Sequence, residues 1–171
     1  MNKATFLSIT VLAAAMLAFS CRQKEQEAAQ IPVTEVNYQQ LKPVFTQNND
    51  TLYVVNFWAT WCGPCVQELP YFMEVNEKFR NKKFQMVLVS LDNPDKLEES
   101  VMDFVNRFGL DRARLYMLND VKNMNEWIPD VDSSWGGTIP ATLIIKNKTN
   151  LWFAAEALTL EELTKQIEQF I

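Results

Sequence analysis

The sequence predicts an α/β fold in which helices flank a central mixed β-sheet on both faces. Two observations predict it. Short, nearly continuous apolar runs alternate with longer segments of helical period, in the order βαβαβ. The chain then closes with two strands joined by a turn and a final helix, the order ββα. Continuous apolar runs are typical of strands that are covered on both faces.

The first half of the predicted domain contains two helices and two strands. Tyr38–Phe45 has the apolar spacing of a short helix, and Leu52–Trp58 is an apolar run of strand length. Gly63–Phe79 has helical periodicity, and we expect Pro70 to interrupt that helix because proline cannot donate the helical hydrogen bond. Phe84–Leu91 is the second buried strand.

The second half repeats the alternation and ends in a hairpin. Apolar residues share one helix face from Asp95 to Phe108, and Gly109 ends that pattern. The last helix opens with a capping box, Thr159 with Glu162. The remaining predicted elements are a weak strand at 114–118, a helix at 120–127, and strands at 139–145 and 151–155 around a turn at 147–150.

Composition limits the classes of function. The chain has 171 residues, 48% of them hydrophobic and 22% charged, as in one globular domain with a core. The net charge is −5 with both signs interspersed, which argues against a nucleic-acid binder because such a protein needs a basic face. The absence of histidine excludes Ser-His-Asp and Cys-His catalysis and removes the commonest transition-metal ligand.

The N-terminus predicts export. After a short basic start, Ala4–Phe19 is apolar over about the length of a signal-peptide core. Small residues precede Cys21 and charged residues follow it, which resembles a bacterial lipoprotein cleavage site. We expect a signal peptide over residues 1–20, a lipid on Cys21, a flexible tether over 21–31 and a domain over 32–171, facing the periplasm. Ordinary signal-peptide cleavage and an uncleaved anchor are the alternatives.

Two of the three cysteines are spaced for redox chemistry. With Cys21 lipidated, Cys62 and Cys65 form one pair, and an exported compartment permits a disulfide. A cysteine just before a helix faces unpaired backbone N–H groups and the positive end of the helix dipole, which stabilise a thiolate. Pro64 suits the first turn, and Cys65 returns to the same side of the helix within disulfide reach.

The run from Trp61 to Cys65 resembles the active-site motif of the thioredoxin superfamily. Asn56–Cys65, continued by Glu68-Leu69-Pro70, is more similar to its membrane-anchored TlpA/ResA/DsbE-type branch, and Thr138-Ile139-Pro140 is similar to the cis-proline loop. The resemblance implies a thioredoxin-like fold and a thiol–disulfide oxidoreductase. Its substrates would be disulfides of exported proteins, with apocytochromes among the candidates. A membrane thiol reductase would recharge it, and no cofactor is implied.

Glu68 is the candidate proton acceptor for Cys65. Cytoplasmic thioredoxins resemble one another in a buried aspartate six residues before the first cysteine, where this chain has Asn56, which cannot titrate. Glu68 lies one turn after Cys65, and the TlpA/ResA-like branch has a glutamate there too. We expect Glu68 to be partly buried with a raised pKa. The competing interpretation is an ordinary glutamate on the helix surface.

The resemblance also implies a substrate groove. A cis Pro140 would present the backbone of Ile139 to a substrate strand, opposite Cys62. Trp61, Gly63 and Pro64 would form the other side. The residues 135–137, Trp-Gly-Gly, either line the same groove or, in the case of the tryptophan, belong to the core.

The sequence argues against a metal site and leaves two other functions open. A zinc site would need two more ligands than the cysteine pair supplies, and the acidic residues at 130 and 132 are assigned no metal. A thiol peroxidase of the same fold is the second enzyme hypothesis. The third hypothesis is a non-catalytic lipoprotein adaptor in which Cys62 and Cys65 form a static disulfide.

Overall fold

The computed structural model describes residues 33–96 and 100–171, which fall within one compact unit. The predicted signal peptide (1–20), the lipidation site Cys21, the tether (21–31) and the first residue of the predicted domain lie outside the described residues.

The described residues form one mixed sheet with the strand order β1-β4-β3-β2-β5-β6. Its strands are β1 (Thr34–Val36), β2 (Leu52–Trp58), β3 (Phe84–Ser90), β4 (Arg114–Leu118), β5 (Ala141–Lys146) and β6 (Thr149–Ala154). The first four strands in this order, β1, β4, β3 and β2, pair in parallel with their neighbours. β5 pairs antiparallel with both β2 and β6. The expected mixed sheet and terminal hairpin are confirmed, and the hairpin turn contains Asn147 and Lys148, both with positive φ.

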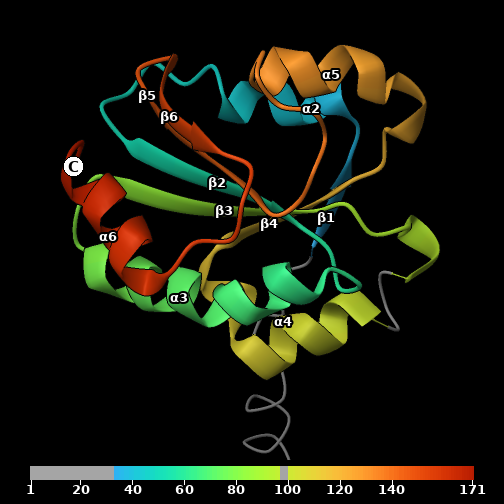
Figure 1. The fold of residues 1–171 in the computed structure, drawn as a ribbon, viewed down its shortest axis with the longest axis horizontal. Coiled ribbons are helices and arrows are strands. Elements are labelled where there is room, and N and C mark those ends of the chain that lie inside the picture. Colours follow the sequence, from blue (N-terminus) through green and yellow to red (C-terminus); the bar gives the residue numbers. More distant parts are fainter. Residues whose placement is uncertain (1–32, 97–99) are drawn as a thin grey trace, which may run out of the picture. The chain divides into compact units, whose positions relative to one another are not determined.

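Helices cover both faces of this sheet, as predicted. The helices are α2 (Tyr38–Leu41), α3 (Gly63–Phe79), α4 (Met102–Phe108), α5 (Met124–Val131) and α6 (Leu160–Glu168). Figure 1 shows α3, α4 and α6 on one side of the sheet and α2 and α5 on the other. Each face has its own cluster of buried apolar side chains.

The central position of β2 in the sheet explains why its sequence is an almost continuous apolar run, in which Asn56 is a buried polar residue. Val54 and Trp58 point into the cluster beneath α3, while Val55 and Phe57 point into the cluster beneath α2 and α5. All seven residues of β2 are buried. Side chains alternate between the faces of a strand, so a strand covered on both sides has no solvent-facing position for a polar residue.

Several element boundaries differ from the prediction. β1 was not predicted; of its three residues only Val36 is buried. The helix expected from Asp95 begins at Met102, after a 3-10 turn at Pro94–Lys96, and Leu97, expected on its apolar face, lies outside the described residues. The helix expected at 120–127 is α5 at Met124–Val131, preceded by a 3-10 turn.

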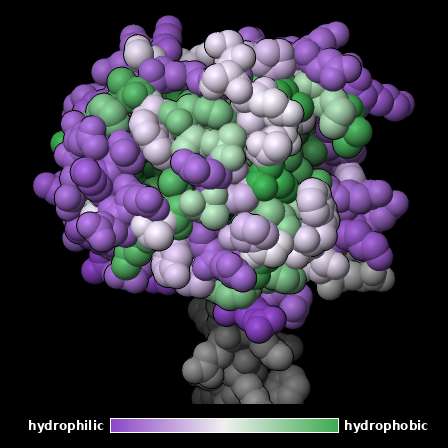
Figure 2. All heavy atoms as spheres, in the orientation of Figure 1, coloured by the Kyte–Doolittle hydropathy of each residue, from purple (hydrophilic) through white to green (hydrophobic). Residues whose placement is uncertain are grey.

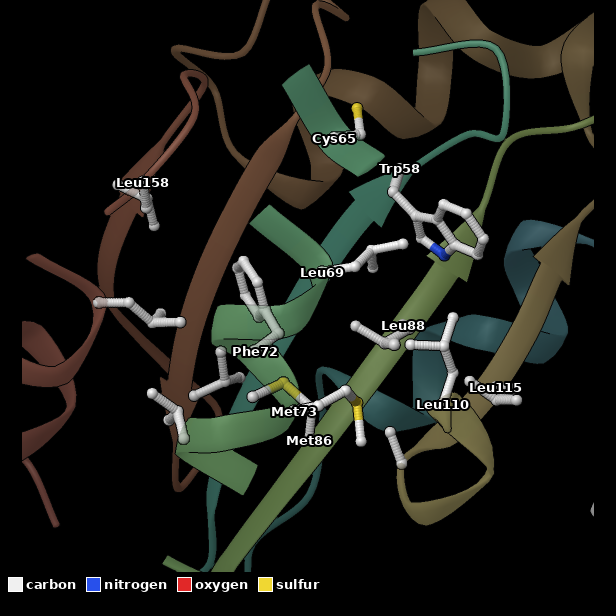
Figure 3. Close-up of a cluster of buried hydrophobic side chains, with 14 of the residues drawn as sticks. Trp58, Cys65, Leu69, Phe72, Met73, Met86, Leu88, Leu110, Leu115 and Leu158 are labelled. Carbon is white, nitrogen blue, oxygen red and sulfur yellow. The ribbon is translucent and has the colours of Figure 1, made fainter. Parts of the chain in front are cut away.

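The expected interruption at Pro70 was wrong. α3 is one continuous helix from Gly63 to Phe79, with Pro70 inside it on the exposed side. The buried side of the helix carries Cys65, Leu69, Phe72 and Met73, which Figure 3 shows packed toward the sheet. Burial of this face offsets the roughly 3 kcal/mol that a proline costs inside a helix.

Candidate active site

Cys62 and Cys65 form a disulfide at the start of α3. Their sulfur atoms are 2.01 Å apart and their Cα atoms 5.3 Å apart. Cys62 is the N-cap residue, with extended backbone angles, and its Sγ accepts a hydrogen bond from Cys65 N at 3.3 Å. Pro64 lies in the first turn, where its missing N–H leaves no helical hydrogen bond unmade. The structure therefore brings the predicted pair together at the predicted end of the helix.

The two cysteines differ in access to solvent. The exposed fraction is 6% for Cys62 and zero for Cys65, which belongs to the core beneath α3. Both residues are buried, but Cys62 is the one of the two that keeps some solvent-accessible surface. Upon reduction, its sulfur faces the N-terminal N–H groups of α3, and both these groups and the helix dipole favour the thiolate. This geometry places Cys62 at the more accessible end of the pair and Cys65 deeper in the core.

The surface beside Cys62 is apolar and exposed. Trp61 has 69% of its surface exposed, the largest fraction among the exposed large hydrophobic residues described. Gly63 and Pro64 are also exposed. Figure 2 shows hydrophobic and neutral residues gathered in the middle of the face that it draws and hydrophilic residues along the margins of that face. The residues on either side of Cys62 in the sequence therefore offer uncharged, exposed surface.

Sequence reasoning missed Asp92, which fixes the loop before Cys62. Its buried carboxylate accepts hydrogen bonds from the Thr60 N–H at 3.0 Å, the Thr60 hydroxyl at 2.7 Å and the Ser90 hydroxyl at 2.7 Å. Thr60 lies two residues before Cys62. The position just after an apolar strand was the available signal, since the ends of parallel strands gather polar groups at one edge of the sheet.

Replacing Asp92 with alanine is expected to destabilise the oxidised protein by about 3 kcal/mol, because two half-buried donors of Thr60 and the buried Ser90 hydroxyl lose their acceptor together. Urea unfolding measures this loss. The matched control is Asp95→Ala on the neighbouring exposed turn, which should change stability by less than about 0.5 kcal/mol. Equal losses in the two variants would show that Asp92 does not hold the loop.

Glu68 is buried, with 2% of its surface exposed, and both carboxylate oxygens are hydrogen-bonded. Oε1 accepts from Asn56 Nδ2 at 2.9 Å, and Oε2 accepts from Leu158 N at 2.8 Å. Burial raises the pKa of Glu68 to about 7, although these two hydrogen bonds act in the opposite direction. The expected burial and raised pKa are confirmed, and the surface interpretation is wrong.

Asn56 connects Glu68 to strand β5. It pairs with Thr142 across the antiparallel β2–β5 ladder, and its Nδ2 donates to Thr142 Oγ1 at 3.1 Å. Neither Thr142 nor the Leu158 N–H was predicted to belong to the site. No short motif contains them, because these groups come from strands and loops far apart in the sequence.

The Ile139–Pro140 peptide bond is cis, as expected. Pro140 is buried and Ile139 is half-buried, directly before β5. β5 begins at Ala141, which pairs with Phe57 on β2, the strand that leads to the cysteine pair. The expected strand start at Ile139 was therefore two residues early.

Trp135 belongs to the core rather than to a groove. It is 4% exposed, its ring centroid lies 4.7 Å from that of Phe57, and its Nε1 donates to Thr138 O at 2.8 Å. It thus supports the loop that leads to Pro140. Within that loop Gly137 has a φ of 87°, a conformation that favours glycine.

The acidic residues at 130 and 132 have protein partners. Asp130 accepts hydrogen bonds from Lys42 Nζ and the Tyr38 hydroxyl, both at 2.7 Å, and Asp132 accepts from Ser134. Residues 33–96 and 100–171 contain no group of three or more Asp, Glu, His or Cys that could hold a metal ion. In the same residues, no helix is long and apolar enough to cross a membrane.

Known proteins are similar to this chain in sequence and in fold. The chain is similar to the thiol-disulfide oxidoreductase ResA of Bacillus thuringiensis, with 39% identity over 56 residues, 33% of this chain and 31% of that protein. ResA of Geobacillus thermodenitrificans is 29% identical over 116 residues, 67% of this chain and 60% of that protein. The matches thus span from about a third to three fifths of these relatives' lengths.

A solved structure of a thiol:disulfide interchange protein of the thioredoxin family, from Chlorobium tepidum, superposes with a TM-score of 0.59 at 18% identity. The superposition covers 75% of this chain and 83% of the Chlorobium tepidum chain. The fold is therefore thioredoxin-like, as the motif implied. The family model described as Redoxin matches residues 26–124. That match includes the cysteine pair and more than half of the sequence, and on this ground the chain belongs to the Redoxin family.

Proposed function

We propose that the protein is a thiol–disulfide oxidoreductase that reduces disulfides of exported proteins through Cys62 and Cys65. The observation that carries the proposal is the unequal pair at the start of α3: Cys62 at the N-cap keeps 6% of its surface exposed, whereas Cys65 is fully buried. A purely structural disulfide needs no such asymmetry. The similarity to ResA proteins supports the same reaction class.

The reaction proceeds in two exchanges. The Cys62 thiolate attacks a substrate disulfide, forming a mixed disulfide and releasing one substrate thiolate. The Cys65 thiol loses its proton to Glu68, and its thiolate attacks Cys62 Sγ, which releases the second substrate thiolate. Two electrons pass to the substrate, and Cys62 and Cys65 are left as the disulfide. A dithiol of a membrane thiol reductase then reduces the pair again.

The substrate groove has two sides in this proposal. Trp61, Gly63 and Pro64 would contact the substrate beside its disulfide, and their exposure leaves them free to do so. Ile139 would pair its backbone with an extended substrate segment, and its half-buried position directly before β5 supports this role.

The reduction potential of the pair is the first measurement. The Gly63-Pro64 dipeptide matches reducing members of the superfamily, so we expect a value near or below about −250 mV by thiol trapping across a dithiothreitol series. A value above roughly −150 mV would indicate an oxidant or isomerase and reverse the proposed electron flow. Consumption of peroxide would favour the thiol peroxidase, and a disulfide inert to dithiothreitol would favour the static adaptor.

The site of action is proposed to be the cell envelope, facing the periplasm, with Cys21 carrying the lipid. The apolar stretch before Cys21 and the charged residues after it support this proposal. Incorporation of radiolabelled fatty acid into the protein, and its loss together with membrane attachment in Cys21→Ser, is the expected result. A Cys21→Ser protein that stays on the membrane would point to an uncleaved anchor instead.

A further inference from the structure

Asn56 has a side chain that is only half satisfied. It is fully buried on β2, and its Nδ2 donates to both Glu68 Oε1 and Thr142 Oγ1. Its Oδ1 is buried with no hydrogen-bond partner, one of two such side-chain atoms among the described residues. An unpaired buried polar atom destabilises the folded protein, so its presence calls for a physical reason.

When Glu68 carries a proton, it needs a hydrogen-bond acceptor for that proton. Each of its oxygens faces an N–H donor, from Asn56 at 2.9 Å and from Leu158 at 2.8 Å. This arrangement suits a carboxylate, which only accepts hydrogen bonds. A carboxylic acid also donates one, and neither N–H can accept it. Asn56 Oδ1 is the unpaired acceptor on a side chain that already contacts Glu68.

We propose that Asn56 is a positioning residue whose side-chain amide turns over when Glu68 takes up a proton, so that Nδ2 binds the carboxylate and Oδ1 binds the carboxylic acid. This inference rests on the proposed function, in which Cys65 gives its proton to Glu68. The proton passes from Cys65 Sγ to a Glu68 oxygen, and the turn breaks no covalent bond and moves no electron. The Thr142 hydroxyl serves both states, because it accepts from Nδ2 and can donate to Oδ1.

Among the groups around Glu68, Asn56 is suited to pair with it in both protonation states. The elements around Glu68 carry these titratable or polar groups: Cys62 at the N-cap of α3, Cys65 on α3, Asn56 on β2, Thr142 on β5, and the Leu158 N–H with the exposed Glu156 on the loop before α6. In the described part of the chain, no positively charged side chain hydrogen-bonds to Glu68. Its change of charge is therefore met by a neutral side chain that can present either a donor or an acceptor.

The test is nuclear magnetic resonance of the oxidised protein as a function of pH. The Glu68 carboxyl carbon reports its protonation, and the Asn56 amide protons report what they contact. We expect nuclear Overhauser contacts from these amide protons to Glu68 Hγ and the Thr142 methyl group above the Glu68 midpoint. The contacts should be lost below it. In Glu68→Gln, the contacts of Asn56 should not depend on pH.

A static amide gives a different result: its chemical shift changes as Glu68 titrates, but its contacts stay the same at both extremes of pH. That outcome would overturn the proposal. Asn56→Leu supplies a second measurement, in which the Glu68 midpoint should rise by about one pH unit as the carboxylate loses a charge-assisted hydrogen bond. An unchanged midpoint would show that Asn56 does not set the proton affinity of Glu68.

Neither measurement needs catalysis. If insulin disulfides are not reduced but the contacts of Asn56 still change with pH, the proposed function fails and the inference about Asn56 stands. If reduction proceeds at full rate while the contacts of Asn56 are constant, the proposed function stands and the inference fails.

Discussion

Replacing Cys62 with serine is expected to abolish disulfide reduction, whereas replacing Cys65 with serine should stop the reaction after its first exchange. A serine hydroxyl at 62 is not ionised at neutral pH, so no nucleophile faces the substrate. In Cys65→Ser the Cys62 thiolate still attacks, but no internal thiol resolves the product. Cys65 is fully buried, and an external thiol cannot easily take its place. The mixed disulfide should therefore accumulate with one substrate molecule per protein.

Insulin reduction and mass spectrometry under non-reducing conditions measure these outcomes. The two variants control for each other, because each loses the same disulfide and its contribution to stability. If Cys62→Ser trapped the substrate and Cys65→Ser did not, the assignment of attacking and resolving sulfur would have to be exchanged. If neither variant trapped it, the static adaptor would be the better hypothesis.

The redox pair could be predicted from the sequence because its chemistry is local. Cys62, Pro64 and Cys65 lie within four consecutive residues, and the N-terminus of one helix supplies both the donors and the dipole that act on them. β2 and β3 were predictable for a similar reason. A strand buried on both faces is a nearly continuous apolar run, and no tertiary information is needed to recognise it.

The remainder of the site depends on long-range contacts. The Leu158 N–H that binds Glu68 lies 90 residues further along the chain, and Thr142 lies 86 residues from Asn56. β1 was missed because two of its three residues are exposed and its pairing partner, β4, begins about 80 residues later. A residue's own sequence neighbourhood carries no signal for such partners, whereas the register of the strands specifies them.

Replacing Glu68 with glutamine is expected to slow the resolution of mixed disulfides by about 10²-fold and to remove its pH dependence near neutrality. Glu68 accepts a proton only as the carboxylate, and burial raises its pKa to about 7. In the parent protein the resolution rate should therefore rise with pH through a midpoint near 7 and level off above it. Stopped-flow measurement with a small disulfide checks this. A Glu68→Gln protein with the parent rate and the parent pH profile would exclude Glu68 as the acceptor.

Stability provides an independent test of the same carboxyl group. The folded protein keeps the proton on Glu68 up to about pH 7, whereas the unfolded chain releases it near the ordinary value of 4.5. Stability of the oxidised parent should therefore fall as pH rises between these values, by up to about 3 kcal/mol. The carboxyls with lowered pKa, Asp50, Asp130 and Glu162, act only at lower pH.

The chain contains no histidine that could titrate between pH 4.5 and 7. Cys62 and Cys65 do not titrate in the oxidised protein because they form a disulfide. A stability change in this window therefore belongs to Glu68. Urea unfolding of the parent and of Glu68→Gln at about pH 5 and about pH 7.5 should show the decrease only in the parent. If both proteins lost stability equally, the carboxyl of Glu68 would not hold its proton to neutrality. Glu68 would then be unsuited to accept the proton of Cys65.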